Sequence, residues 1–257
     1  MKITFLGTSS GKTSLKRYHS SILFSLEKYN LLIDAGDGIS RTLINNRINF
    51  NSINGILFTH LHPDHFSGLP ALIVQIKMMN RNKPLEIFIH KSLVEVVEYF
   101  IIHSYLLPEK MGFEINYKGF NDDERFNITE KFLFIAKKNS HLHNLEKYQN
   151  KYSSLSLYCA SFLFESDSKK IIYTSDIGAE EDLLLFSEIV PDLFISEVTH
   201  ISPLILLEKI KSIKPDMTYL THYADEDIPA LSEIMANLPN ALKEKVILAV
   251  DNISFDF

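Results

Sequence analysis

The fold is decided by the stretch Gly55-Ile56-Leu57-Phe58-Thr59-His60-Leu61-His62-Pro63-Asp64-His65. It begins as an apolar run typical of a buried strand and ends in three histidines and a carboxylate within six positions. Neutral imidazole nitrogen is a good ligand for Zn²⁺, Mn²⁺ or Fe. Pro63 pre-sets a helical turn, so Asp64 and His65 open the helix expected over 66–79. We therefore expect one tight loop to supply ligands to two metal positions. The alternative is a polar loop that happens to be rich in histidine and binds no metal.

Length and composition predict one soluble α/β domain covering 1–257. The 257 residues are 46% hydrophobic and 23% charged, which is typical of a globular protein. No apolar run is long enough to cross a bilayer, and the N-terminus reads as a strand and not as a signal peptide, so the expected location is cytoplasmic, with no membrane partner. The single cysteine, Cys159, cannot form an internal disulfide and lies in an apolar run, where a buried structural role is expected.

The net charge of −6 provides no global attraction to nucleic acid or to an anionic membrane. Clusters such as Lys12, Lys16 and Arg17 could still face a phosphate. Composition alone therefore leaves nucleic acid open as a partner.

Apolar patterning predicts strands that alternate with helices, as in layered α/β proteins. The expected strands cover 3–6, 22–26, 31–33, 55–58, 85–89, 113–117, 132–136, 155–164, 170–174, 192–196, 217–220 and 246–250, and the expected helices cover 39–48, 66–79, 91–107, 180–189, 203–213 and 227–238.

A glycine-bearing loop, Gly7-Thr8-Ser9-Ser10-Gly11-Lys12-Thr13, resembles a phosphate-binding P-loop. That motif needs four residues between its glycines, whereas three separate Gly7 from Gly11. No helical apolar period follows, so no helix N-terminus would face a phosphate. ATP binding remains an alternative, which would show as tight binding that does not depend on the histidines.

Histidine and carboxylate side chains recur after later strands. His141 and His143 lie in one polar loop, and either could complete a metal site. The two oxygens of Asp176 could bridge two cations, or Asp176 could cap a helix. His222 ends another strand. Because open α/β sheets bind ligands beyond the carboxyl ends of their strands, we expect one shared site.

Asp34 closes the strand expected over 31–33, immediately before an Ala-Gly-Asp-Gly turn. A carboxylate here could orient a ligating histidine, as metal sites commonly require, or it could form a turn. The residue type alone leaves both roles open.

The motif His60-x-His62-x-Asp64-His65, with later single His and Asp residues, resembles the metallo-β-lactamase superfamily of metal-dependent hydrolases. The resemblance implies a single-domain, four-layer αββα sandwich with a dinuclear metal site along one edge of its two sheets. Within the superfamily the first half is most similar to ribonuclease Z, the endonuclease that trims tRNA precursors. The matching residues lie at 5–8, 20–23, 31–38 and 58–70.

The resemblance implies a metal ligand set of seven residues. His60, His62 and His141 would hold one ion, Asp64, His65 and His222 would hold the second, and Asp176 would bridge them. His141 is preferred to His143 because it is the first histidine beyond the strand. The two ions are expected to be Zn²⁺, with Mn or Fe as alternatives.

Two departures from ribonuclease Z concern its substrate. No segment here has the length and composition of the Gly- and Pro-rich arm that grips the tRNA elbow. Where that family has a His-Glu pair, this chain has Ser196-Glu197, with His200 three residues further on. His200 could then be the proton donor to the leaving group.

The predicted activity is phosphodiester hydrolysis by a metal-bridging hydroxide, formed from a water that Asp64 would orient or deprotonate. Glu197 and His200 would orient or protonate the leaving group. The expected partner is a phosphodiester-containing small molecule or RNA, and the resemblance suggests a homodimer. Alternatives are a lactone or thioester hydrolase on the same fold and a non-catalytic metal-binding sensor.

Overall fold

The computed structural model describes residues 1–167 and 169–257, which form two compact units. The first unit contains Met1–Phe120 and Val250–Phe257, and the second contains Asn121–Ala249. The expectation that the chain acts as one domain stays a prediction. Across the described ranges, no helix combines the length and the apolar character that a bilayer span requires.

The first unit is built on a seven-stranded sheet with the order β14-β1-β2-β3-β4-β5-β6. Strands β3 to β6 run parallel, and the buried apolar runs in β3 and β4 are typical of a sheet covered on both faces. The strands are β1 (Lys2–Gly7), β2 (Ser21–Ser25), β3 (Asn30–Ile33), β4 (Gly55–Leu57), β5 (Leu85–His90), β6 (Ile115–Phe120) and β14 (Ser254–Asp256).

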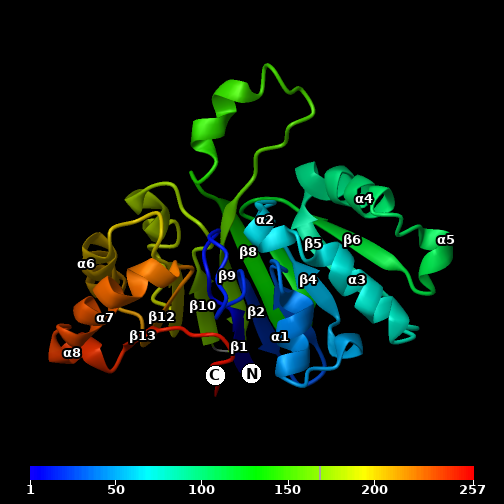
Figure 1. Cartoon of the computed structure of the whole chain (residues 1–257). Helices are drawn as coiled ribbons and strands as arrows, with labels where there is room; N and C mark the ends of the chain where they lie inside the picture. The colour runs from blue at the N-terminus through cyan, green and yellow to red at the C-terminus, as the bar shows by residue number, and fades with distance from the viewer. Residues whose placement is uncertain (168) are drawn as a thin grey trace. The chain divides into compact units, whose positions relative to one another are not determined.

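Helices of the first unit follow the strands as expected, with shorter bounds. Figure 1 shows α1 and α3 side by side against the sheet. The helices are α1 (Ile39–Asn45), α2 (Pro63–Phe66), α3 (Leu69–Met78), α4 (Val94–His103) and α5 (Pro108–Met111), with 3₁₀ turns η1 (Phe50–Ser52) and η2 (Lys91–Leu93).

The helix expected over 66–79 is interrupted, which corrects the prediction. A first short helix, α2, begins at Pro63 and ends at Phe66, and α3 begins at Leu69. The chain passes so close to its neighbour at Gly68 that a Cβ there would lie 2.3 Å from the carbonyl oxygen of Gly36. Pro70 then starts the second helix in the first-turn position that proline favours.

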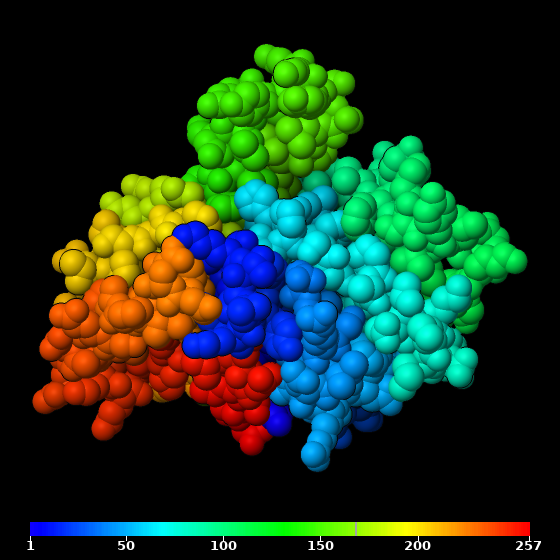
Figure 2. All heavy atoms as spheres, viewed as in Figure 1, coloured from blue at the N-terminus to red at the C-terminus, as the bar shows by residue number. Residues whose placement is uncertain are grey.

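The C-terminal strand β14 returns to the first unit and pairs antiparallel with β1, a pairing that the sequence did not predict. Ile3 lies opposite Phe255, and the N-terminal ammonium of Met1 donates to the carbonyl of Phe257 at 2.9 Å. The two termini therefore lie side by side in Figure 1 and, as blue and red atoms, in Figure 2.

The second unit contains another seven-stranded sheet with the order β13-β12-β11-β10-β9-β8-β7. Strands β10 to β13 run parallel, and helices α6 and α7 pack on the sheet through a common apolar core. The strands are β7 (Arg125–Thr129), β8 (Phe132–Lys138), β9 (Ala160–Ser166), β10 (Lys169–Tyr173), β11 (Leu193–Glu197), β12 (Met217–Thr221) and β13 (Val246–Leu248), and the helices are α6 (Pro203–Ile213), α7 (Ile228–Ala236) and α8 (Asn240–Lys243), with 3₁₀ turns η3 (His143–Tyr148), η4 (Glu180–Leu184) and η5 (Asp225–Asp227).

Three expectations for the second unit are wrong. The helix expected over 180–189 is only the 3₁₀ turn η4, on which the Asp182 carboxylate accepts the amides of Ser140, Gly178 and Ala179. The strand expected over 155–164 begins at Ala160, and residues 139–159 project from the sheet as a long connection between β8 and β9 (Figure 1). The edge strand β7 was missed because its exposed residues lack an apolar run.

Candidate metal centre

In the first unit, the parallel pairing of β3 with β4 places Asp34 beside the loop 58–65. Leu32 lies opposite Ile56, and the amide of Asp34 donates to the carbonyl of Leu57 at 2.8 Å. Both strands therefore deliver their polar residues at the same edge of this sheet, as the sequence predicts.

The three histidines of this loop converge. The ring centroid of His60 lies 4.7 Å from that of His62 and 4.2 Å from that of His65. Nε2 of His65 lies 3.7 Å from Oδ2 of Asp64. These four side chains come from one turn around Pro63, so local chain geometry alone brings together four of the seven predicted ligands.

The buried carboxylate of Asp34 fixes the orientation of two of these histidines. Its Oδ2 lies 2.7 Å from Nδ1 of His65 and accepts the Thr59 hydroxyl at 2.9 Å. That hydroxyl is 3.0 Å from Nδ1 of His60, and having donated its proton to Asp34 it accepts from the imidazole. Both imidazoles then carry their proton on Nδ1 and present the Nε2 lone pair, the arrangement that metal-ligating histidines adopt.

Asp34 is therefore an orienting carboxylate, and of the two roles left open by its residue type the structure supports this one. Burial raises the pKa of Asp34, while His65 and the hydrogen bonds from Thr59 oppose the rise. Replacing the carboxylate removes the acceptor on which both histidines depend.

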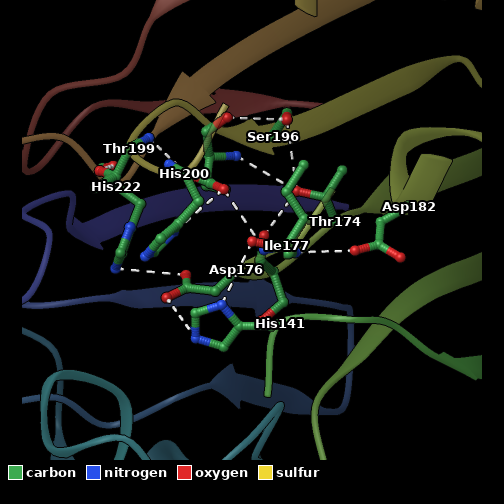
Figure 3. A network of polar contacts seen from close by, with 12 residues as sticks. His141, Thr174, Asp176, Ile177, Asp182, Ser196, Thr199, His200 and His222 are labelled. Carbon is green, nitrogen blue, oxygen red and sulfur yellow. Dashed lines mark hydrogen bonds and ion pairs between the residues drawn. The ribbon is translucent and has the colours of Figure 1, made fainter. Parts of the chain in front are cut away.

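In the second unit, Asp176 lies between two histidines, as Figure 3 shows. Its Oδ2 is 3.7 Å from Nε2 of His141, and its Oδ1 is 3.4 Å from Nε2 of His222. Each oxygen of one buried carboxylate thus faces a different imidazole. This is the geometry expected of a carboxylate shared by two cations, and the helix-cap alternative fails because η4 begins at Glu180.

Left-handed backbone marks the ends of three strands that carry site residues. Asp34, Ser175 and His222 have φ angles of +58°, +54° and +57°. Residues with a Cβ pay about 1 kcal/mol or more for this conformation, and it persists where surrounding structure enforces it. In each case the chain turns sharply out of the sheet and presents a polar side chain beyond the strand end.

Two residues that sequence reasoning missed hold the His141 loop. The Asn139 side chain donates to the carbonyl of Asp176 at 2.8 Å and accepts the amide of His141 at 3.2 Å. The Asp182 carboxylate accepts the amide of Ser140 at 3.1 Å and that of Gly178 at 2.9 Å. Only the position of Asn139, two residues before a predicted ligand, could have indicated this role.

His141 and His143 lie in different environments. The His141 side chain is 7% exposed and faces Asp176, whereas the His143 side chain is 79% exposed and faces Glu146 at 3.5 Å. Cys159, behind this loop, is buried as predicted, and its thiol donates to the carbonyl of Asp176 at 3.4 Å. The geometry therefore agrees with the choice of His141.

Glu197 and His200 form a pair beside His222. Oε1 of the buried Glu197 lies 3.3 Å from Nδ1 of His200, and Oε2 accepts the amide of His200 at 2.9 Å. The His200 ring stacks 5.9 Å from that of His222 and meets that of His141 edge-on at 4.8 Å (Figure 3). One ligand atom from each of Glu197, His200 and His222 lies within 4.8 Å of the others.

The donor atoms present suit a divalent transition metal such as Zn²⁺. Both units offer imidazole nitrogen and carboxylate oxygen, without thiolate or thioether, in largely buried surroundings. Such a set fits Zn²⁺, Mn²⁺ or Fe²⁺ better than Ca²⁺ or Mg²⁺, which prefer oxygen ligands.

Two mixed sheets with flanking helices, a His-x-His-x-Asp-His turn after β4 and later His and Asp residues at strand ends are typical of the metallo-β-lactamase fold. Human tRNase Z, short form (ELAC1), aligns with 100% of this chain and 99% of its own, with a TM-score of 0.74 and 20% identity. The metallo-beta-lactamase fold protein YhfI from Bacillus subtilis aligns with 99% of this chain and 98% of its own, with a TM-score of 0.76 and 18% identity. Zn²⁺-bound PqqB from Methylobacterium extorquens aligns over the full length of both chains, with a TM-score of 0.70 and 14% identity. The predicted fold class is confirmed.

Within this fold, the chain belongs to the family described as Anti-Pycsar protein Apyc1, which it matches over residues 1–234. It is also similar to a protein named Ribonuclease Z from Methanococcus maripaludis (strain S2), with 34% identity over 135 residues, 47% of this chain and 44% of that protein. The chain therefore spans about half the length of the curated relatives it matches. The predicted resemblance to ribonuclease Z is confirmed over this region.

Proposed function

We propose that the chain is a phosphodiesterase that depends on two divalent metal ions, and we expect these ions to be Zn²⁺. The observation that carries the proposal is Asp176, whose two oxygens each face a histidine, at 3.7 Å and 3.4 Å. A carboxylate placed in this way could bridge a pair of cations, and paired cations are typical of enzymes that cleave phosphate esters.

The ligands are proposed to divide between the ions as the superfamily resemblance implies. The first ion would take His60, His62 and His141, the second would take Asp64, His65 and His222, and Asp176 would bridge. Indirect support for this division comes from the hydrogen bonds of Asp34 and Thr59. They place the imidazole protons of His60 and His65 on Nδ1, so that Nε2 of each ring has a lone pair for a metal ion.

When bound, the ions would supply an activated water and would stabilise charge on the phosphoryl oxygens. Asp64 is proposed to orient that water or accept its proton. His200, held through Nδ1 by the buried Glu197, is proposed to protonate the leaving oxygen through Nε2. The half-exposed position of the His200 side chain suits contact with a substrate.

A small phosphodiester is the proposed substrate, with RNA as the broader alternative. Residues 139–159 contain neither glycine nor proline, so they lack the composition of the ribonuclease Z arm, and the chain as a whole carries a net charge of −6. We also propose a homodimer, on the resemblance to ribonuclease Z alone, which light scattering after size-exclusion chromatography tests.

The test is hydrolysis by purified protein that has been stripped with a chelator and reloaded with Zn²⁺ or Mn²⁺. The substrates are bis(p-nitrophenyl) phosphate, a 3′,5′-cyclic mononucleotide as a small natural phosphodiester, a tRNA precursor and a simple lactone. We expect metal-dependent cleavage of the two small diesters. Cleavage of the lactone alone would make the protein an acyl hydrolase, and metal binding with no turnover would make it a sensor.

Asp176→Ala is the variant for this assay, and Asp216→Asn, an exposed carboxylate before β12, is its control. We expect Asp176→Ala to lose bound metal and turnover together, with the control unchanged. A metal-loaded and active Asp176→Ala protein would end the proposal.

A further inference from the structure

The Asp251 carboxylate closes the neck of the loop 8–18, which follows β1 in the first unit. Its Oδ1 accepts both the backbone amide of Thr8, at 2.9 Å, and the Thr8 hydroxyl, at 2.7 Å. Its Oδ2 accepts the amide of Tyr18 at 2.7 Å. One side chain from the far end of the sequence therefore holds both ends of this loop.

Asp251 is itself fixed to the sheet. The next residue, Asn252, donates its amide to the carbonyl of Phe5 at 2.7 Å, and Phe5 donates back to the carbonyl of Ile253 at 3.0 Å. In Figure 2 the N-terminal residues, in blue, adjoin the C-terminal residues, in red. The clamp thus ties the loop to the strand from which it leaves.

Internal hydrogen bonds give the loop a defined path. The Ser14 hydroxyl accepts the amides of Lys16 and Arg17, each at 3.0 Å. The Ser9 hydroxyl donates to the carbonyl of Lys12 at 3.1 Å, and the Arg17 guanidinium donates to the carbonyl of Thr8 at 3.3 Å. A displacement of the neck would therefore carry the whole loop with it.

The loop lies against Asp64. A Cβ built on Gly11 would be 3.4 Å from Oδ2 of Asp64. Beyond the neck, a Cβ on Gly36 would meet both the carbonyl of Asp64, at 2.1 Å, and Cβ of His19, at 2.6 Å. The chain on both sides of the clamp is thus packed on the residue proposed to orient the attacking water.

Three cations concentrate on this loop, although the chain has a net charge of −6. Lys12 and Lys16 are exposed and Arg17 is half-buried. A phosphodiester is an anion, and cations on a loop that adjoins its binding site raise its local concentration.

We infer that Asp251 is a positioning residue: by clamping the loop 8–18 against Asp64, it sets the affinity of the site for an anionic phosphodiester. The inference rests on the proposed function. Asp251 touches neither the metal ligands nor the substrate in this scheme, so its replacement should change KM more than kcat.

The test compares two variants. Asp251→Asn keeps the shape of the side chain but only one of its two oxygen acceptors, and Asp251→Ala keeps neither. The control is Asp256→Asn, an exposed carboxylate in the same C-terminal segment. With bis(p-nitrophenyl) phosphate at low salt, we expect KM to rise about tenfold in Asp251→Ala and less in Asp251→Asn. We expect kcat to change by less than about twofold, with metal content unchanged.

Salt dependence and hydrogen exchange separate this role from a general loss of stability. The wild-type KM should rise with salt because the loop cations are screened, and the rise should be weaker in both Asp251 variants. The amides of Thr8 and Tyr18 should exchange faster in the variants. An unchanged KM, an equal effect in Asp256→Asn, or loss of metal would overturn the inference.

If the wild-type protein cleaves no phosphodiester, the proposed function fails and the inference is tested with inorganic phosphate. Phosphate that protects the loop amides from exchange in the wild type and not in Asp251→Ala supports the clamp. Equal protection, or none, overturns it.

Discussion

Oδ2 of Asp34 lies 2.7 Å from Nδ1 of His65, and both side chains are fully buried. The same carboxylate holds the Thr59 hydroxyl, which in turn contacts His60, so one acidic group at the end of β3 sets the proton positions of two imidazoles. A buried carboxylate is costly without such partners, and here its partners are the groups that orient two histidines.

Asp34→Asn should weaken metal binding by about 10–100-fold, because an amide has one acceptor oxygen where the carboxylate has two, so its NH2 would face a donor, either Nδ1–H of His65 or the backbone N–H of Thr59. Competition with a chromogenic chelator measures the change. Asp37→Asn, an exposed carboxylate three residues away, is the control and should bind metal as the wild type does. Equal affinities in all three proteins would contradict the orienting role of Asp34.

His141→Ala and His143→Ala form a matched pair on one loop. Because His141 faces Asp176 and His143 points to solvent, we expect the first variant to lose at least one metal equivalent and the second to retain both. Metal analysis of the dialysed proteins decides between them. The opposite pattern would assign the ligand to His143.

His200→Ala should slow a diester with a poor alkoxide leaving group by about 10²-fold or more, since proton donation to that oxygen is lost. The rate with bis(p-nitrophenyl) phosphate should change little, because p-nitrophenolate leaves without protonation. Kinetics with the two substrates in parallel report the difference. A uniform loss with both substrates would remove His200 from the role of proton donor and leave it a structural one.

Asp182→Ala should lower the free energy of unfolding by about 2 kcal/mol, because it leaves several partly buried amide donors without their charged acceptor. The lost contacts include Ser140 and Gly178, so the His141 loop should loosen as well. Urea unfolding measures the stability, and Glu181→Gln, exposed on the same turn, is the control. Similar unfolding curves for the two variants would show that Asp182 does not stabilise this loop.

The burial of Asp251 leads us to expect that the free energy of unfolding decreases as pH rises through the pKa of this carboxyl. Burial raises its pKa above the ordinary value of 3.8, although bonds from Thr8 and Tyr18 oppose the rise. The folded state therefore binds this proton more tightly than the unfolded state, and the contribution to stability falls as pH rises from 3.8 through the folded pKa. Urea unfolding should show the wild type losing stability relative to Asp251→Asn across that interval. A difference in unfolding free energy between the wild type and Asp251→Asn that does not vary with pH would contradict this expectation.

Local sequence signals were enough to predict that the histidines of the loop after β4 lie together. His60 to His65 lie in one turn, so residue type and spacing were enough to gather them. The amphipathic helix α6 also occupies the expected residues 203–213.

Contacts between residues far apart in the chain could not be predicted from the sequence. Asn139 and Asp182 act through backbone groups that are far away along the chain or belong to irregular loops, and no residue pattern marks them. The helix expected over 180–189 is likewise only the 3₁₀ turn η4, a difference that intrinsic helix propensity does not anticipate.

The return of β14 to β1 has a consequence for synthesis on the ribosome. Residues 250–257 emerge only after the whole second unit has been made, and the bonds between Asp251 and Thr8 join positions 243 apart in the chain. Contacts of such long range form late and slowly. The nascent first unit must therefore wait with an unpaired edge at β1 while the second unit is translated, a period in which chaperones or neighbouring chains can capture that edge.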